Sequence, residues 1–201
     1  MNRKACEYLC ACDAALAPWV KRIGQIKHKA RRLAPFHALI RAIIHQQLSG
    51  IAAGSIARKF QALFPGNEMP TPEQVLATAP ETLRSAGLSR AKLRYILDLA
   101  QKALDGVVPT LEEVDTLTDE ELISLLTQIN GVGRWTVEMM LIFDLARPDV
   151  LPVHDLSIRK GFAMVFRKRK LPKPEAIRKY GELWKPHRTT AALYLWRASV
   201  L

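Results

Sequence analysis

No apolar run in this sequence approaches the length of about 18 residues that a membrane-spanning helix needs. Near the N-terminus, Arg3 and Lys4 precede an apolar stretch that Glu7 and Asp13 interrupt, and such a stretch makes a poor secretory signal. We therefore expect a soluble intracellular protein that makes no contact with a membrane.

Cysteine is also scarce, because the 201 residues include only Cys6, Cys10 and Cys12. An odd number of thiols clustered in one predicted helix provides no disulfide framework, so we interpret them as reduced, with metal binding as the alternative. The five histidines are scattered along the chain and form no group with metal-ligand spacing.

An alternating pattern typical of β-strands is missing as well, and amphipathic helical patterns follow one another instead. The strongest covers residues 35–48 and places Leu48 on the same apolar face as Ile40 and Ile44. Ser89 has the position of a cap for another long helix. Since 49% of the residues are hydrophobic, the chain can bury a full core. We predict an all-α protein, either one domain over residues 1–201 or two closely packed helical lobes.

The charge balance is strongly basic, with 30 Lys and Arg against 19 Asp and Glu and a formal net charge of +11. Such an excess favours a polyanionic partner such as nucleic acid. The alternative is a solvated surface whose charge serves only solubility.

The most informative segment is residues 129–136, INGVGRWT, which separates two helical patterns. Upstream, Thr118 and Glu121 have the spacing of a capping box at the start of the first helix. The turn is too short to cross back over a sheet, so we predict a tight helical hairpin over about residues 118–146.

Gly131 and Gly133 in that turn would leave backbone N–H groups bare at the start of the second helix. Bare N–H groups at a helix N-terminus bind phosphate, which agrees with the basic composition. The alternative is that glycine serves only a turn with positive φ.

A lone carboxylate, Asp155, follows Gly133 by 22 positions and begins the next helical pattern. On its own, this position is typical of a helix N-cap. A carboxylate beside a phosphate anchor also fits chemistry next to a nucleic-acid backbone, and the two roles are compatible.

Residues 129–145 and 151–159 (LPVHDLSIR) resemble the helix-hairpin-helix base-excision DNA glycosylases, in which a Gly/Pro-rich loop and an aspartate follow the hairpin. Within that superfamily, four motifs in the right order are similar to those of the alkylpurine (3-methyladenine) glycosylases. They are residues 44–49 (IHQQLS), 131–136 (GVGRWT), 184–188 (WKPHR) and 194–196 (YLW). The resemblance extends from about residue 35 to residue 198.

The resemblance implies a two-lobed, all-α glycosylase fold with the active site in the cleft between the lobes. It makes Asp155 the catalytic residue, within a catalytic segment of about residues 147–166. The enzyme would flip the nucleotide out of the stack, and the carboxylate would stabilise the positive charge that the departing base leaves on the sugar. Bifunctional members carry a nucleophilic lysine directly after the hairpin's arginine, where this chain has Trp135. We therefore expect hydrolysis by water, without lyase activity.

The resemblance also implies a base pocket with aromatic walls, to which Trp135 and Trp196 would contribute. An N-alkylated purine is a cation, and stacking it on electron-rich rings is a cation–π interaction. Met139 stands where related enzymes can have a tyrosine, which leaves the selectivity of the pocket open. The alternative is that both tryptophans are ordinary core residues.

DNA contacts are implied at two places. Gly131 and Gly133 would bind a phosphate near the lesion, and Arg134 would add a further phosphate contact. Where the helix over residues 35–48 ends, related enzymes push a residue into the minor groove. The candidates there are Gln46, Gln47 and Leu48; which of Gln47 and Leu48 is the wedge stays open.

A metal ion is implied as well. Backbone carbonyls that match Thr127, Ile129 and Val132 coordinate Na⁺ or K⁺ in the hairpins of similar proteins. An iron-sulfur cluster is not expected, because no cysteine occurs beyond Cys12. The 34 residues before the first motif also leave no room for the N-terminal β domain of longer relatives.

This chain departs from many relatives at His154, where they have an acidic or small residue, and at Ser157, which replaces a frequent glycine. We predict a monomeric glycosylase that excises alkylated bases from double-stranded DNA, in the cytoplasm near the nucleoid or in the nucleus. The alternatives are a non-catalytic helix-hairpin-helix DNA-binding module and a glycosylase for other purine lesions.

Overall fold

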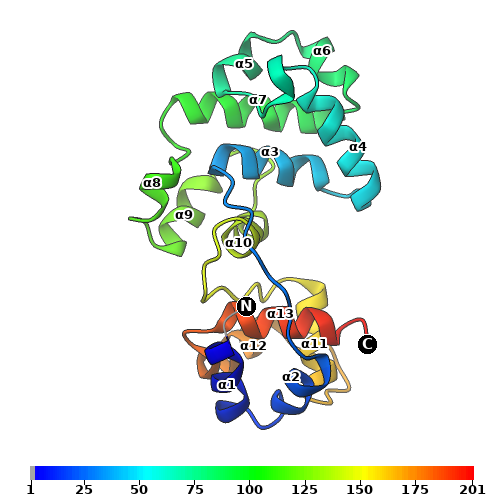
Figure 1. Cartoon of the computed structure of the whole chain (residues 1–201), viewed down its shortest axis with the longest axis vertical. Helices are drawn as coiled ribbons and strands as arrows, with labels where there is room; N and C mark the ends of the chain where they lie inside the picture. Colours follow the sequence, from blue (N-terminus) through cyan, green and yellow to red (C-terminus); the bar gives the residue numbers. More distant parts are fainter. Residues whose placement is uncertain (1–2) are drawn as a thin grey trace. The chain divides into compact units, whose positions relative to one another are not determined.

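The computed structural model describes residues 3–201, and all regular secondary structure in that range is helical, which confirms the all-α prediction. The chain divides into two compact units (Figure 1). Unit 2 is the continuous stretch Arg32–Met140, whereas unit 1 combines the residues as far as Arg31 with Leu141–Leu201. A single functional domain over the whole chain stays a prediction. Over residues 3–201, no helix combines the length and apolar character needed to cross a membrane.

Helix α7 (Arg90–Leu104) is the centre of unit 2 and buries Leu93, Ile96 and Leu99. Its start is capped as predicted, because the Ser89 hydroxyl accepts a hydrogen bond from the backbone N–H of Lys92 at 3.2 Å. The helices around it are α3 (Pro35–His45), α5 (Pro72–Ala77) and α6 (Pro80–Ser85), and α4 (Gly50–Gln61) packs on α3. The short helices η1 (Pro65–Asn67) and α8 (Leu111–Val114) complete this part of the unit.

Helix α3 is shorter than its periodicity predicts. It ends at His45, and Gln47 follows in the left-handed region with φ 56°. Leu48 is 40% exposed, so the prediction that it continues the apolar face of this helix is wrong. Lys92 of α7 stabilises the early end by binding two carbonyls there, a contact that periodicity alone does not reveal.

The predicted hairpin consists of α9 (Asp119–Leu126), a turn, and α10 (Arg134–Phe143). Its capping box is complete: Thr118 Oγ1 accepts from the backbone N–H of Glu121 at 3.3 Å, and the Glu121 carboxylate accepts from the backbone N–H of Thr118 at 2.7 Å. The boundary between the two units falls inside α10, after Met140.

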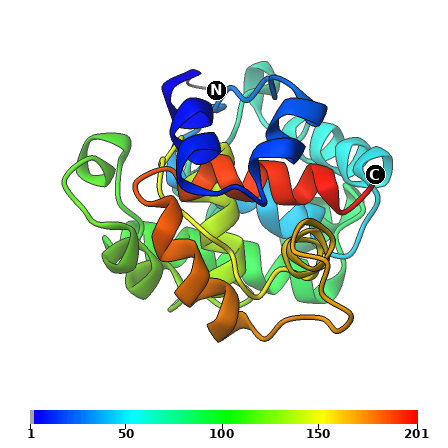
Figure 2. The same ribbon diagram turned by 90° about the horizontal axis from the view of Figure 1, so that it is seen from below.

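Helix α13 (Arg188–Ala198) is the centre of unit 1. Figure 2 shows it with α1 (Arg3–Cys12) and α2 (Ala17–Ile23) on one side and α11 (Leu156–Val165) and α12 (Pro174–Tyr180) on the other. It packs most extensively on α11, and η2 (Gly181–Trp184) precedes it. The three cysteines lie on α1 as free thiols.

The close packing of α11 on α13 depends on one glycine. A Cβ at Gly161 would overlap the backbone carbonyl of Leu195. Because glycine lacks that atom, the two helix backbones can approach closely. This approach brings the start of α11 near Trp196 on α13.

A buried carboxylate joins the two chain segments of unit 1. Asp13 Oδ1 accepts from the backbone N–H groups of Ala15 and Leu16, each at 3.0 Å, and Oδ2 accepts from the indole N–H of Trp184 at 2.8 Å. The same environment affects Tyr180, since burial and then the charge of Asp13 raise the pKa of its hydroxyl to about 12.

Candidate active site

Asp155 is the N-cap of α11, as one of its two predicted roles required. Its Oδ1 accepts from the backbone N–H of Ile158 at 2.9 Å. The same oxygen accepts from the indole N–H of Trp196 at 3.0 Å. Two N–H donors and the positive end of the helix dipole stabilise a negative charge here and fix the orientation of the carboxylate. Capping and catalysis are therefore compatible.

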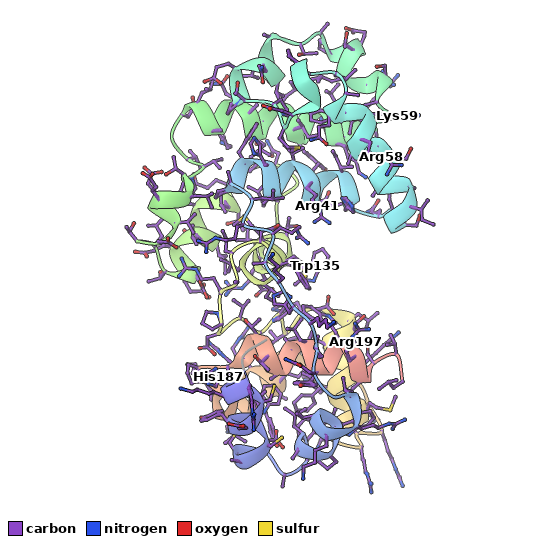
Figure 3. The ribbon with its side chains drawn as sticks, viewed as in Figure 1. Arg41, Arg58, Lys59, Trp135, His187 and Arg197 are labelled. Carbon is purple, nitrogen blue, oxygen red and sulfur yellow. The ribbon has the colours of Figure 1, made fainter. Side chains whose placement is uncertain are left out.

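Trp196 connects this carboxylate to a hollow in unit 1. Its ring stacks on that of Phe143, with centroids 5.6 Å apart and an interplanar angle of 29°. It also lines a hollow of about 320 Å³, together with His28 and Arg197, the latter labelled in Figure 3. The core alternative does not account for its bond to Asp155. A place in the base pocket stays a prediction.

The turn of the hairpin exposes both glycines. Gly131 has φ 79°, and the ring of Tyr95 occupies the position where a Cβ would lie. Gly133 has open space around its missing Cβ, and its carbonyl starts α10 by accepting from Thr136 and Val137. Within residues 3–201, the N–H groups of Gly131 and Gly133 donate to no protein acceptor. The predicted phosphate site thus has N–H donors without protein partners. The alternative, that glycine serves only a turn with positive φ, accounts for Gly131 but not for Gly133.

Arg134 is engaged inside unit 2. Both terminal nitrogens of its guanidinium bind the carboxylate of Glu120 on α9, and its Nε donates to the buried carboxylate of Glu138 at 3.2 Å. Glu120, with a smaller contribution from Glu138, raises the pKa of Arg134. The side chain therefore links the two helices of the hairpin, and its phosphate contact stays a prediction.

The cation site stays a prediction, and its expected ligands are three backbone carbonyls in the hairpin. Ile129 O accepts one hydrogen bond, from the N–H of Val132 at 3.0 Å. Over residues 3–201, the carbonyl oxygens of Thr127 and Val132 accept none. Carbonyl oxygens are suitable ligands for hard cations, so this donor set fits Na⁺ or K⁺. In the same range, no group of three or more His, Cys, Asp or Glu side chains has the arrangement of a metal site.

The segment after α3 lies against the turn. Gln46 Nε2 donates to the carbonyl of Gly131 at 2.8 Å, so Gln46 joins the two predicted DNA contacts within unit 2. Gln47 and Leu48 are both exposed, and the choice of wedge between them stays open. Ile51, which the sequence did not indicate, is 89% exposed beside them.

Unit 2 also carries basic side chains that single motifs did not indicate. Figure 3 labels Arg41 on α3 and Arg58 and Lys59 on α4. Of these, Arg58 and Lys59 are exposed and Arg41 is partly buried. They contribute to the net charge of +11 that favours a polyanionic partner.

Trp135 stands at the start of α10 (Figure 3) and is 46% exposed, which argues against an ordinary core position. Met139 lies one turn further on and is partly buried. Both belong to unit 2, whereas Trp196 and Asp155 belong to unit 1. A pocket that all of them share stays a prediction.

Comparison with known protein families identifies the superfamily of this chain. The profile of the HhH-GPD superfamily of base excision DNA repair proteins matches residues 40–186, which include the end of α3, the hairpin and Asp155. The chain belongs to the HhH-GPD superfamily. The prediction of helix-hairpin-helix glycosylase ancestry is confirmed by this match.

Individual relatives are similar to this chain over nearly its whole length. It is 40% identical over 200 residues to DNA-3-methyladenine glycosylase 1 of Schizosaccharomyces pombe, covering 98% of this chain and 88% of that protein. The structure of the S. pombe 3-methyladenine DNA glycosylase in complex with abasic DNA has a TM-score of 0.87 and 40% identity, covering 98% of this chain and 97% of that one. DNA-3-methyladenine glycosidase from Bacillus halodurans has a TM-score of 0.87 and 31% identity, with coverage of 97% and 88%.

Sequence reasoning missed several residues of this HhH-GPD site. The sequence predicts Trp196 as a pocket wall or a core residue, but not as a donor to Asp155, and it does not indicate Lys92, Tyr95 or Asp98 of α7. A lysine three positions after a helix cap carries no local signal of a remote partner. Only the fold brings its ammonium to the end of α3.

Proposed function

We propose that this HhH-GPD protein is a monofunctional DNA glycosylase that flips alkylated bases out of duplex DNA and excises them by hydrolysis. The observation that supports this most directly is the Asp155 carboxylate, oriented through one oxygen by Ile158 and Trp196. The name of the S. pombe relative, DNA-3-methyladenine glycosylase 1, supports 3-methyladenine as a substrate. We include 7-methylguanine because it is also an N-alkylated, cationic purine.

The reaction breaks the bond between the anomeric carbon and the base nitrogen, and the electron pair leaves with the base. N-alkylation gives the base a positive charge, so it departs as a neutral molecule. The sugar becomes a cation, which the fixed carboxylate of Asp155 stabilises. Water then adds to the anomeric carbon and loses a proton, for which a carboxylate is a suitable acceptor. The product is an abasic site.

In this proposal the partner is double-stranded DNA and the protein acts as a monomer, near the nucleoid or in the nucleus. Thr127, Ile129 and Val132 would hold a Na⁺ or K⁺ ion through their carbonyls, and that ion would offset phosphate charge beside the turn. The hydrolysis needs no iron-sulfur cluster or other resident redox group.

The test is the release of free bases from methylated duplex DNA, separated by chromatography. Free 3-methyladenine and 7-methylguanine are the expected products. Tight DNA binding without any release would instead identify a non-catalytic DNA-binding module. Release restricted to deaminated or oxidised purines would move the enzyme to another lesion class.

We expect Gly133→Ala to weaken DNA binding about 10-fold, because its Cβ would keep a phosphate away from the bare N–H groups. The loss should be equal for damaged and undamaged duplex in a fluorescence-anisotropy titration. Gly133 is the better test position, since a Cβ at Gly131 would also strike Tyr95 and strain the backbone. A loss confined to damaged DNA would refute the phosphate role.

We expect Trp135→Ala to reduce excision of cationic 7-methylguanine about 2- to 30-fold more than excision of neutral hypoxanthine, because only the cation gains from the ring face. Single-turnover rates on the two substrates measure the difference. Trp196→Ala should lower both rates together, since it also removes the donor to Asp155. Equal losses in Trp135→Ala would leave that ring only a packing role.

We expect no covalent protein–DNA adduct when borohydride is added during turnover, and intact abasic sites as products. The residue after Arg134 is an indole, which cannot form the Schiff base that a lyase needs. Denaturing gel electrophoresis detects both the adduct and strand cleavage. A trapped adduct in the wild-type protein would refute the monofunctional assignment even if Asp155 proves essential.

A further inference from the structure

Three side chains of α7 contact the two segments of unit 2 that the proposed function assigns to DNA. Lys92, Tyr95 and Asp98 follow one another at intervals of three residues along about 9 Å of this helix. Such spacing places them along one side of the helix. The adjoining side of the helix, with Leu93, Ile96 and Leu99, is buried in the core of unit 2, so the helix is a fixed support.

At the N-terminal end of this series, Lys92 contacts the segment at the end of α3. Lys92 Nζ donates to the carbonyls of Ile44 and Gln46, at 2.7 and 2.8 Å. An ammonium at a helix C-terminus is favourable because carbonyls there lack helical partners. The next residue, Gln47, has φ 56°, a conformation that non-glycine residues adopt only when their surroundings impose it.

The contacts at the other end are to the hairpin turn. Asp98 Oδ2 accepts from the backbone N–H of Asn130 at 2.7 Å, and the ring of Tyr95 fills the space beside Gly131. Gln46 closes the arrangement by donating to the Gly131 carbonyl at 2.8 Å. Each segment is therefore held to α7, and the two segments are held to each other.

We propose that Lys92 and Asp98 are positioning residues, which make α7 a brace that presents the Gln46–Leu48 segment and the hairpin turn to DNA as one preformed surface. This proposal rests on the proposed function, because it needs both segments to contact DNA. A duplex with an abasic site can accept a wedge residue from the Gln46–Leu48 segment while the hairpin turn binds a phosphate. An undamaged duplex has no vacated space for the wedge, so only its phosphate backbone is contacted. The brace therefore determines the preference for abasic over undamaged DNA.

The test compares affinities for abasic and undamaged duplex in Lys92→Met, which keeps the length of the side chain but removes the ammonium. We expect the preference for abasic DNA to fall at least about 10-fold, with affinity for undamaged duplex within about 3-fold of the wild type. Lys92→Arg can still donate to two carbonyls and should restore most of the preference. Thermal unfolding of each variant shows whether it is folded.

Lys102→Met is the matched control, because it removes a lysine from the last turn of the same helix, outside the brace. It should leave the preference unchanged. If Lys92 itself bound a phosphate, Lys92→Met would instead weaken both duplexes equally and reduce the slope of log affinity against log salt by about 0.9. That result, or an unchanged preference, would overturn the brace.

A double-mutant cycle with Asp98→Ala tests whether the two ends act together. For one brace, the double variant should lose little more preference than the stronger single variant, whereas independent supports would give additive losses in log affinity. Additive losses, or a wild-type protein that binds both duplexes equally, would overturn the proposal. These measurements use binding alone, so a protein that fails to excise methylated bases would refute the proposed activity without deciding the brace.

Discussion

Asp155→Asn should lower the rate of base excision by about 100-fold or more, while affinity for abasic DNA stays within a few-fold of the wild type. The amide oxygen can still accept from Ile158 and Trp196, so the cap of α11 and the orientation of the side chain are preserved. What is lost is the negative charge that stabilises the sugar cation. Single-turnover excision of 7-methylguanine and an abasic-DNA titration measure the two quantities.

The control for this variant is its free energy of unfolding, which should be close to that of the wild type because the capping bond remains. Near wild-type excision by Asp155→Asn would show that another group stabilises the cation. A parallel loss of abasic-DNA affinity would show that the residue shapes the DNA surface rather than the chemistry.

Gly161→Ala should be the most destabilising single methyl addition in unit 1, lowering the free energy of unfolding by roughly 3 kcal/mol or more. The added Cβ would overlap the Leu195 carbonyl, and backbone cannot rotate away as a flexible side chain can. For a chain of this size the midpoint of thermal unfolding should fall by about 6–12 °C. Excision should also fall, because separating α11 from α13 pulls Asp155 away from Trp196.

Gly54→Ala is the matched control for this effect. Gly54 lies inside α4, and its nearest neighbour to an added Cβ is the Arg58 guanidinium at an ordinary 3.8 Å. Alanine favours the helix by about 1 kcal/mol over glycine, so this variant should unfold at the same or a higher temperature. If Gly161→Ala unfolds at the wild-type temperature, the close approach of the two helices is not required.

Local signals predicted the parts of the molecule that depend on neighbouring residues. The Thr118 capping box, the Ser89 cap and the Asp155 cap were all read correctly, because each joins residues only three positions apart. The glycine turn followed from its spacing. The catalytic role of the carboxylate comes from the family resemblance and stays a prediction.

Contacts between distant residues could not be predicted in this way. The prediction for Leu48 failed because Lys92, 48 residues after Ile44, helps to end α3 before the apolar pattern does. For Trp196 the sequence predicts a pocket wall or a core residue, since nothing in the sequence joins it to a carboxylate 41 residues earlier. Such pairs are products of tertiary packing, which overrides local propensity.

The division of the chain also has a consequence for its synthesis. Unit 2 is a continuous segment inserted into unit 1, so all of it has been made once residue 140 is added. Unit 1 cannot fold until later, because the contacts of Asp13 with Trp184 and of α2 with α13 form only after the last part of the chain has been synthesised. Domains fold as units from the N-terminus during translation. The turn that we propose to bind DNA can therefore fold before Trp196, the partner of Asp155, has been added to the chain.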